Sequence, residues 1–460
     1  MPEKINEYLD SVCAHIKYKA IHQEIRDELN AHINDLKDEY VQVTENEEVA
    51  LDLAIAAMGD CESIGKNLNK QHQPQTEWAI IGLTAVIALI GGAVIYISSL
   101  SIQAVNFERY LFCAILGIVI MAGCYFFDYT KLKKLAWPLY LLTLALLVAI
   151  IYSTVSGYVV SLDNRVISVL SQIIILPLVI SFAGFVETNR SKRGFAIIKL
   201  QIAASLVAAP MFTLRSISPV ITFIFVLMML ILYAVFNNHF GGSRRYQLFY
   251  LAGASCLTAF AILNAFVFGT FRMARIINFF MQDEPLGLGY QRMVAGLILS
   301  NSNLFGRTTA MMNGRELIGF MPEAEITTSY AIVNVIGTLG WVAGTALLSA
   351  ILVFIYRMFI TTMKIKNKFG FYLSLASCSV LFQQFVTGIM LNFNLIPLMS
   401  VSIPFVSYGG TGYIVNMALI GLILSIWRMN NITSGHAHTV CVQLAPFTQN
   451  ESVRLEAPLD

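Results

Sequence analysis

The strongest constraint on this sequence is a regular alternation, from Trp78 onward, of long apolar stretches and short polar breaks. Each apolar stretch is about 20 residues long, the length of a helix that crosses the hydrocarbon core of a membrane. Helix is the expected form, because a backbone inside a bilayer must satisfy its own hydrogen bonds. We predict spans at 78–98, 110–127, 135–155, 166–186, 197–213, 217–236, 247–270, 329–360, 371–392 and 408–427.

The composition also favours a membrane protein. Hydrophobic residues make up 57% of the 460 residues and charged residues only 13%, whereas soluble domains carry about 25% charged residues. The predicted fold class is therefore all-α: a polytopic membrane protein of about ten transmembrane helices behind a small soluble helical bundle. The net charge is only +2, and no basic run is interleaved with stacking aromatics, so membrane lipid and not nucleic acid is the expected partner.

The start of the chain is polar and carries apolar residues at helical spacing, such as Ile25, Leu29 and Ile33. The stretches HQEIRDELNAHINDLKDEY and ALDLAIAAMGDCESIGKNL resemble the small helical module that precedes some bacterial permease-like membrane proteins. On composition alone, a solvated bundle that only docks partners or stabilises the terminus is the favoured interpretation. We predict a cytoplasmic helical domain at 1–75, a membrane domain at 76–428 and a flexible cytoplasmic tail at 429–460.

Lysine and arginine gather in every second loop, after the second, fourth, sixth and eighth predicted spans. Short basic loops stay in the cytoplasm. Both termini are therefore predicted to be cytoplasmic, and the longest loop, 271–328, is predicted to lie outside. This loop is longer than a connection between two helices needs, and loops of such length usually carry function.

The loop 271–328 contains five arginines and not one lysine. The arginines are Arg272, Arg275, Arg292, Arg307 and Arg315. A guanidinium group makes paired hydrogen bonds to phosphate that an ammonium group cannot make, so this composition favours a phosphate or pyrophosphate ligand. The alternative is that the arginines pair with acidic residues of the same loop, which are Asp283, Glu284, Glu316, Glu323 and Glu325.

A general base on the outer side must be a carboxylate, because all seven histidines fall on the predicted cytoplasmic side. The candidates are Glu323 and Glu325 in the sequence MPEAE, just before the eighth span. Their alternative role is structural, with Pro322 ending one helix and Glu323 capping the next. No HExxH or cysteine-rich spacing indicates a metal site.

An uncharged connection, NFNLIPLMSVSIPFVSYGGTG, joins the last two predicted spans. Proline and paired glycines cannot continue a helix, so this stretch must turn back within or just above the membrane, where its free backbone groups need protein or substrate partners. The spans hold almost no ionisable side chain, with Lys199 as the nearest case. Ion-coupled carriers retain such groups along their pathway, so the pattern argues against a carrier of that kind.

Three motifs of the membrane part occur in an order that is typical of one family. IPFVSYGGTG stands at 403–412, RIINFFMQDEPLGLGYQ at 275–291 with NLFGR at 303–307, and MPEAEITTSYAIVNVIGTLGW at 321–341. They resemble, in turn, the C-terminal signature, the long outer loop and the entry to the eighth helix of the SEDS family. These are the bacterial shape, elongation, division and sporulation proteins of the FtsW, RodA and SpoVE kind. The resemblance covers about residues 78–428.

The resemblance implies a peptidoglycan glycosyltransferase that polymerises lipid II, an undecaprenyl-pyrophosphate-linked disaccharide-peptide, at the outer face of the bacterial cytoplasmic membrane. It also implies a role in cell shape, division or sporulation beside a class B penicillin-binding protein. The reaction needs a base and cationic groups at the departing pyrophosphate, with a divalent cation, Mg²⁺ or Mn²⁺, as an optional addition. The expected substrate-binding residues are Arg275, Gln291, Arg292, Arg307, Ser407, Tyr408, Gly409 and Gly410.

One departure from the family pattern affects the catalytic position. The family usually carries an aspartate shortly after the Pro-Glu of the third motif, and the matching position here is Ser329. Serine cannot act as a base unaided, so the expected base is Glu323 or Glu325, and an alignment gap would bring Glu325 into the role. Two alternatives stay open: a catalytically impaired scaffold that binds lipid II or a penicillin-binding protein, and a lipid II flippase. The spans offer few polar groups to line a flippase path.

Overall fold

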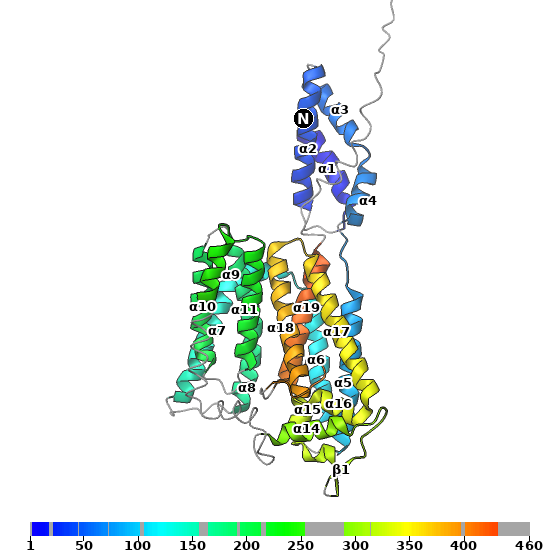
Figure 1. Ribbon diagram of the computed structural model, residues 1–460. Coiled ribbons are helices and arrows are strands. Elements are labelled where there is room, and N and C mark those ends of the chain that lie inside the picture. The colour runs from blue at the N-terminus through cyan, green and yellow to red at the C-terminus, as the bar shows by residue number, and fades with distance from the viewer. Residues whose placement is uncertain are drawn as a thin grey trace, which may run out of the picture. The chain divides into compact units, whose positions relative to one another are not determined.

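The chain divides into two compact units, Met1–Gln75 with Arg428–Asp460 as unit 1 and Thr76–Trp427 as unit 2 (Figure 1). The computed structural model describes residues 2–17, 22–44, 46–71, 73–101, 105–155, 164–190, 194–212, 218–253, 289–312, 314–396 and 401–430.

Unit 1 is built on four helices with one apolar core. The helices are α1 (Pro2–Ala14), α2 (His22–Thr44), α3 (Glu47–Met58) and α4 (Cys61–Gln71). The core includes Leu9 of α1, Ile33 of α2 and Leu51 of α3. The side chain of Asn46 accepts a hydrogen bond from the Glu48 amide, which satisfies one of the donors that a helix start leaves without a partner. The apolar spacing at the start of the chain therefore corresponds to a packed helical bundle.

In the described part of unit 2, the regular structure is helical apart from a hairpin of two two-residue strands, β1 (Met311–Met312) and β2 (Arg315–Glu316). Its first helices are α5 (Trp78–Ser101), α6 (Phe107–Phe126), α7 (Leu132–Val155), α8 (Asn164–Ile173), α9 (Ile175–Thr188), α10 (Gly194–Met211) and α11 (Ser218–Phe236). The later ones are α14 (Tyr290–Ser300), α15 (Glu323–Thr328), α16 (Ala331–Leu339), α17 (Trp341–Met363), α18 (Lys368–Asn392) and α19 (Gly410–Met429), with short 3-10 turns at Tyr129–Lys131 and Leu317–Phe320.

The all-α membrane fold is confirmed. Within the described residues, eight helical segments are long and apolar enough to cross a membrane, and α10 is a shorter apolar helix. The span predicted at 247–270 lies mostly outside the described residues, which reach only residue 253 there.

The single span predicted at 329–360 is wrong, because the chain forms two helices there, α16 and α17, with a break at Gly340. Gly340 has a φ of +95°, which side-chain-bearing residues rarely adopt. The carbonyls of Asn303 and Leu304 accept hydrogen bonds from the amides of Trp341 and Val342. The segment before α15 therefore satisfies the first donors of α17 and takes the place of a continuous helix.

Gly340→Ala will lower the stability of the protein by about 1–3 kcal/mol, because a residue other than glycine is strained in this region of φ and ψ. The new methyl group would also lie 2.5 Å from the Leu304 carbonyl oxygen, which is backbone and has little room to move. Thermal unfolding of the detergent-purified protein measures the loss. Gly123→Ala is the control, since a methyl group there meets no atom within 4 Å; equal stability of the two variants would contradict the prediction.

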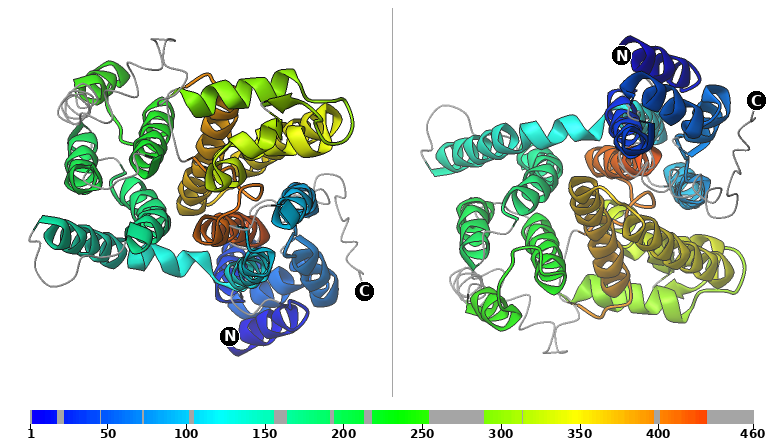
Figure 2. Two further views of the ribbon diagram at one scale, coloured as in Figure 1. Left: turned by 90° about the horizontal axis from the view of Figure 1, so that it is seen from below. Right: turned by 90° about the horizontal axis from the view of Figure 1, so that it is seen from above.

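Helix α18 has a central position in unit 2, where it packs against α9, α11 and α17 (Figure 2). The two ends of the bundle are formed by different segments. Lys133 pairs with Glu187 at one end, where the chain enters α7 and leaves α9. At the opposite end lie α14, α15, α16 and the β hairpin (Figure 1). The motif at 321–341, which forms α15 and α16, therefore lies at the end away from the lysine-rich loops, and the motif at 403–412 is hydrogen-bonded to it there.

Candidate functional site

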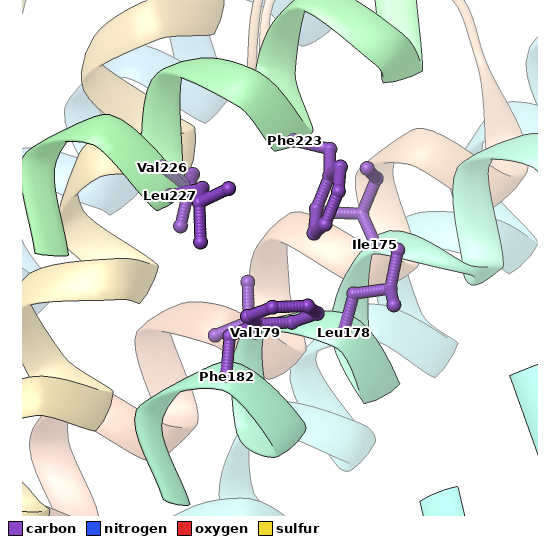
Figure 3. Close-up of a pocket in the computed structure, with 7 residues that line it drawn as sticks. All are labelled: Ile175, Leu178, Val179, Phe182, Phe223, Val226 and Leu227. Carbon is purple, nitrogen blue, oxygen red and sulfur yellow. The ribbon is translucent and has the colours of Figure 1, made fainter. Parts of the chain in front are cut away.

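A small pocket between α9 and α11 is apolar throughout and does not suit a phosphorylated substrate (Figure 3). Its lining residues are Ile175, Leu178, Val179, Phe182, Phe223, Val226 and Leu227. A site for a pyrophosphate needs charged or hydrogen-bonding groups to replace water around the ligand. Charged and hydrogen-bonding side chains lie instead at the end of unit 2 where α14, α15 and α16 meet the connection between α18 and α19.

The short helix α15 presents the two candidate carboxylates. Pro322 precedes it, and Glu323 and Glu325 both lie in its first turn. Residues two apart do not share a helix face, and the two differ in environment, since Glu323 is exposed and Glu325 is half-buried. The Glu325 carbonyl accepts hydrogen bonds from the amides of Ser329 and Tyr330, which closes the helix before α16 begins. Pro322 thus stands directly before the start of α15, in agreement with the structural role predicted for it.

The connection between α18 and α19 is bonded directly to α15. The Ser407 hydroxyl donates to the Thr328 carbonyl at 2.5 Å and accepts from the Ile403 amide at 2.7 Å. The Tyr408 amide donates to the Thr327 carbonyl at 2.8 Å. Two segments some 80 residues apart in sequence are therefore in direct contact. Within the stretch 393–412, which was predicted to turn back, the Ile403 and Tyr408 amides are bonded to protein groups.

Helix α14 adds an arginine to the same end of the bundle. The Asn394 side chain donates to the Arg292 carbonyl at 3.1 Å, which joins α14 to the end of α18. The Gln291 Oε1 atom is buried and accepts no hydrogen bond from the residues that the structure describes. An unsatisfied buried acceptor of this kind is rare in native proteins. Gln291 and Arg292 thus remain together as ligand-binding candidates.

The pKa of Tyr330 is affected by the burial of its side chain and by charged groups of the site. It lies between α15 and α16, outside the eight spanning segments, and belongs to an apolar cluster with Val294, Ile318 and Val401. Burial, and to a lesser degree the Glu325 carboxylate, raise the pKa of Tyr330 to about 12, whereas Arg292 opposes the rise. A carboxylate and a guanidinium group therefore act on one buried ring.

Arg307 lies at the other end of α16. The amides of Gly306 and Thr308 donate to the carbonyls of Leu339 and Gly337, whereas Glu325 precedes the start of that helix. With nine residues in α16, the two ends are about 13 Å apart. Arg307 also forms an exposed ion pair with Glu316. The alternative prediction, in which arginines of the loop pair with acidic residues of the loop, therefore applies to Arg307. Arg307 does not lie close to Glu325.

Arg307→Ala will lower the free energy of unfolding by no more than about 1 kcal/mol, because an exposed ion pair contributes about 0–1 kcal/mol. Thermal unfolding of the purified variant measures the change. Glu316→Ala is the matched control, since it removes the other partner of the same pair. A clearly larger loss in Arg307→Ala alone would show that Arg307 makes further interactions.

The remaining predicted residues have different environments. Ser329, at the family aspartate position, is buried with 2% of its surface exposed. Tyr408 and Gly409 are half-buried, and the Tyr408 hydroxyl lies 3.4 Å from the Asn106 carbonyl oxygen. A methyl group on Gly410 would lie 2.7 Å from the Cys113 Sγ atom, so close packing against α6 explains that glycine. Arg275 lies outside the described residues.

Two residues of the site were missed from the sequence, Asn392 and Asn394. Both stand in the segment NFN at the end of α18 and use their side chains to hold other elements. The only signal was their polarity within a long uncharged stretch. Among the described residues, no group of three or more histidine, cysteine, aspartate or glutamate side chains forms a ready metal site, so the divalent cation stays a prediction.

The comparison with known families decides the assignment. The model of the cell cycle proteins FtsW, RodA and SpoVE matches residues 75–432. This chain belongs to that family. The membership confirms the resemblance drawn from the three motifs, and together with the apolar helices it makes the chain a multi-pass membrane protein.

Relatives within the FtsW/RodA/SpoVE family are distant in sequence. The probable peptidoglycan glycosyltransferase FtsW of Trichlorobacter lovleyi is 23% identical over 208 residues, which are 45% of this chain and 50% of the relative. The protein of that name from Geobacter sp. is 22% identical over 368 residues, which are 75% of this chain and 95% of the relative. The chain thus spans about half the length of the first relative and most of the second.

A solved structure shares the fold. One chain from a study of a peptidoglycan synthase complex that coordinates polymerization and crosslinking superposes with a TM-score of 0.57 at 17% identity. The match covers 77% of this chain and 98% of the other. At this identity the likeness establishes the arrangement of the helices in this FtsW/RodA/SpoVE family member.

Proposed function

We propose that the protein is a peptidoglycan glycosyltransferase that polymerises lipid II. The observation that carries the proposal is the hydrogen bonding of α15, which bears Glu325, to the connection before α19, together with the bond that joins the Arg292 carbonyl of α14 to Asn394 at the end of α18. A base and a cation on one site are the two groups that glycosyl transfer from a pyrophosphate requires. Names of relatives in the same family, such as the probable glycosyltransferase FtsW, support the same chemistry.

Each side chain then has a defined role. The acceptor sugar's 4-hydroxyl oxygen forms a bond to the anomeric carbon of the donor, and Glu325 takes the hydroxyl proton. The bond between that carbon and the pyrophosphate oxygen breaks, and undecaprenyl pyrophosphate leaves with the electron pair. Arg292 pairs with the developing charge through its guanidinium fork, and Gln291 offers an amide with an unused acceptor. Tyr408 and Gly409 lie at the half-buried edge of the same site.

A divalent cation would be shared with the substrate. Mg²⁺ in such sites keeps several waters and is bound largely by substrate phosphates, so the pyrophosphate of lipid II would supply most of its protein-independent ligands while Glu325 acts as the base. Mg²⁺ or Mn²⁺ would add positive charge at the leaving group. Polymerisation measured in chelator and then with either cation restored tests this role, and rates equal in chelator and in Mg²⁺ would remove it.

The proposed place of action is the outer face of the cytoplasmic membrane, with a class B penicillin-binding protein as the partner. The site lies at the end of unit 2 away from the lysine-rich loops (Figure 1), and basic loops remain in the cytoplasm. The fold shared with a chain of a peptidoglycan synthase complex supports a crosslinking partner.

Gel analysis of lipid II incubated with the purified protein, alone and with a cognate class B penicillin-binding protein, tests the proposed function. We expect a ladder of glycan strands in at least the second mixture. Lipid II that remains monomeric in both mixtures would contradict the proposal. Transport of fluorescent lipid II across vesicles without any polymer would favour a flippase instead.

A non-catalytic scaffold is the second candidate, and the burial of Ser329 at the family aspartate position favours it. Such a protein would bind lipid II or a penicillin-binding protein without transferring sugar. Ser329→Asp distinguishes the two. Polymer that appears only in this variant would support a scaffold that has lost its base, whereas an active parent protein would exclude it.

A further inference from the structure

Asn392 is a fully buried carboxamide that joins three elements of the site. It stands at the last position of α18 with 0% of its surface exposed. Its Oδ1 atom accepts hydrogen bonds from the amides of Ile332 and Val333, both at 3.0 Å. Its Nδ2 atom donates to the carbonyls of Ser329 at 2.9 Å and Gly388 at 2.8 Å. A carboxamide has two donor hydrogens and two acceptor sites, so this side chain is fully used.

These bonds hold the break between α15 and α16. Ile332 and Val333 lie in the first turn of α16, where backbone amides have no partner within the helix. Ser329 follows α15, and its carbonyl points to the same side chain. One carboxamide from α18 therefore caps the second helix and holds the end of the first.

The neighbouring carbonyls are held in the same way. The carbonyl of Thr327 accepts from the Tyr408 amide, and that of Thr328 accepts from the Ser407 hydroxyl. Three consecutive carbonyls, at residues 327, 328 and 329, are thus each bonded to a donor from α18 or from the connection that follows it. This arrangement fixes α15 against a rigid helix, as a site that needs accurate geometry requires.

We propose that Asn392 is a positioning residue for glycosyl transfer, which rests on the function proposed above. It acts through Ser329: the Ser329 and Tyr330 amides both donate to the Glu325 carbonyl, so a shift of Ser329 displaces Glu325 as well. Because Asn392 is buried, it contacts no substrate. Its loss changes the geometry of the reacting groups and leaves substrate affinity largely intact.

Asn392→Leu tests the proposal, with Asn392→Asp as the conservative variant. Leucine removes all four hydrogen bonds at similar volume. Aspartate keeps the acceptor for the two α16 amides but turns the two donated bonds into contacts between oxygens. The matched control is Gln383→Leu, which removes another buried carboxamide of α18, one that accepts from Thr222 at 2.7 Å. Both leucine variants lose a buried interaction, but only one of these interactions reaches α15.

The kinetic readout separates positioning from general destabilisation. We expect Asn392→Leu to lower kcat about 10²-fold, as small misplacements of reacting groups do, with KM within about threefold of the parent value. Gln383→Leu should keep kcat within about threefold while losing similar thermal stability. Equal kcat values in the two leucine variants would overturn the proposal.

A second readout does not depend on activity, so failure of the positioning role and failure of the proposed function are distinguishable. Ser329→Cys places a thiol at a buried position, on tryptic peptide 316–357, which holds no native cysteine. We expect Asn392→Leu and Asn392→Asp each to raise the rate of thiol modification at this position about tenfold, because local opening becomes easier. Gln383→Leu should leave the rate unchanged. Rates unchanged in both Asn392 variants would overturn the proposal even if the protein polymerises lipid II.

Discussion

Glu325→Gln will lower the rate of lipid II polymerisation by about 10²–10⁴-fold, the usual contribution of a general base. Glutamine has nearly the same shape as glutamate but cannot take up the proton of the acceptor hydroxyl. The backbone bonds from Ser329 and Tyr330 to the carbonyl of residue 325 do not involve the side chain. The variant should therefore fold like the parent. Gel densitometry of glycan strands, together with thermal unfolding, measures both quantities.

Glu323→Gln is the control for this experiment. Glu323 is exposed and stands on a different face of α15 from Glu325. We expect its variant to retain most of the parent's activity. The reverse ranking would assign the base to Glu323, and undiminished polymer formation in both variants would show that neither carboxylate is the base.

Arg292→Ala will lower the same rate by about 10²–10³-fold, comparable to the removal of one group that stabilises charge in a transition state. Arg292→Lys should recover only part of the loss, because lysine keeps the charge but not the two parallel hydrogen bonds of the guanidinium fork. The backbone carbonyl of residue 292 still accepts from Asn394 in both variants, so α14 should stay docked. An Arg292→Ala variant as fast as the parent would rule out Arg292 as the pyrophosphate ligand.

The membrane architecture was predictable because it depends on local composition. Uncharged stretches of sufficient length specify spanning helices wherever they occur, and α5, α6 and α11 follow the predicted spans closely. The break at Gly340 was not predictable in this way. It depends on the carbonyls of Asn303 and Leu304, which lie some 37 residues earlier and replace the helical bonds of α17.

The candidate site was predictable in part. Residue type and order pointed to Glu325, Arg292 and Ser407, and the structure brings these three to one end of the bundle. Arg307 has the same residue type and the same loop but lies at the far end of α16, paired with Glu316. Asn392 gave little signal because its role is made entirely of long-range hydrogen bonds. The sequence shows which residue types can act as a base or bind phosphate more readily than it shows which side chains lie close together.

The central claim is that the end of unit 2 formed by α14, α15 and the connection before α19 binds lipid II outside the cytoplasm. Glu323→Cys tests it most directly, because this exposed position lies beside the proposed site and outside its machinery. Lys366→Cys, on the exposed loop before α18, is the matched control for the cytoplasmic face.

The measurement is modification of each thiol by a membrane-impermeant maleimide, in intact cells and in the purified protein with and without lipid II. We predict that Glu323→Cys is modified in intact cells and that lipid II slows its modification in the purified protein, whereas Lys366→Cys reacts only after the cells are opened. Modification of Glu323→Cys only from the cytosolic side, at a rate that lipid II leaves unchanged, would contradict the proposed site.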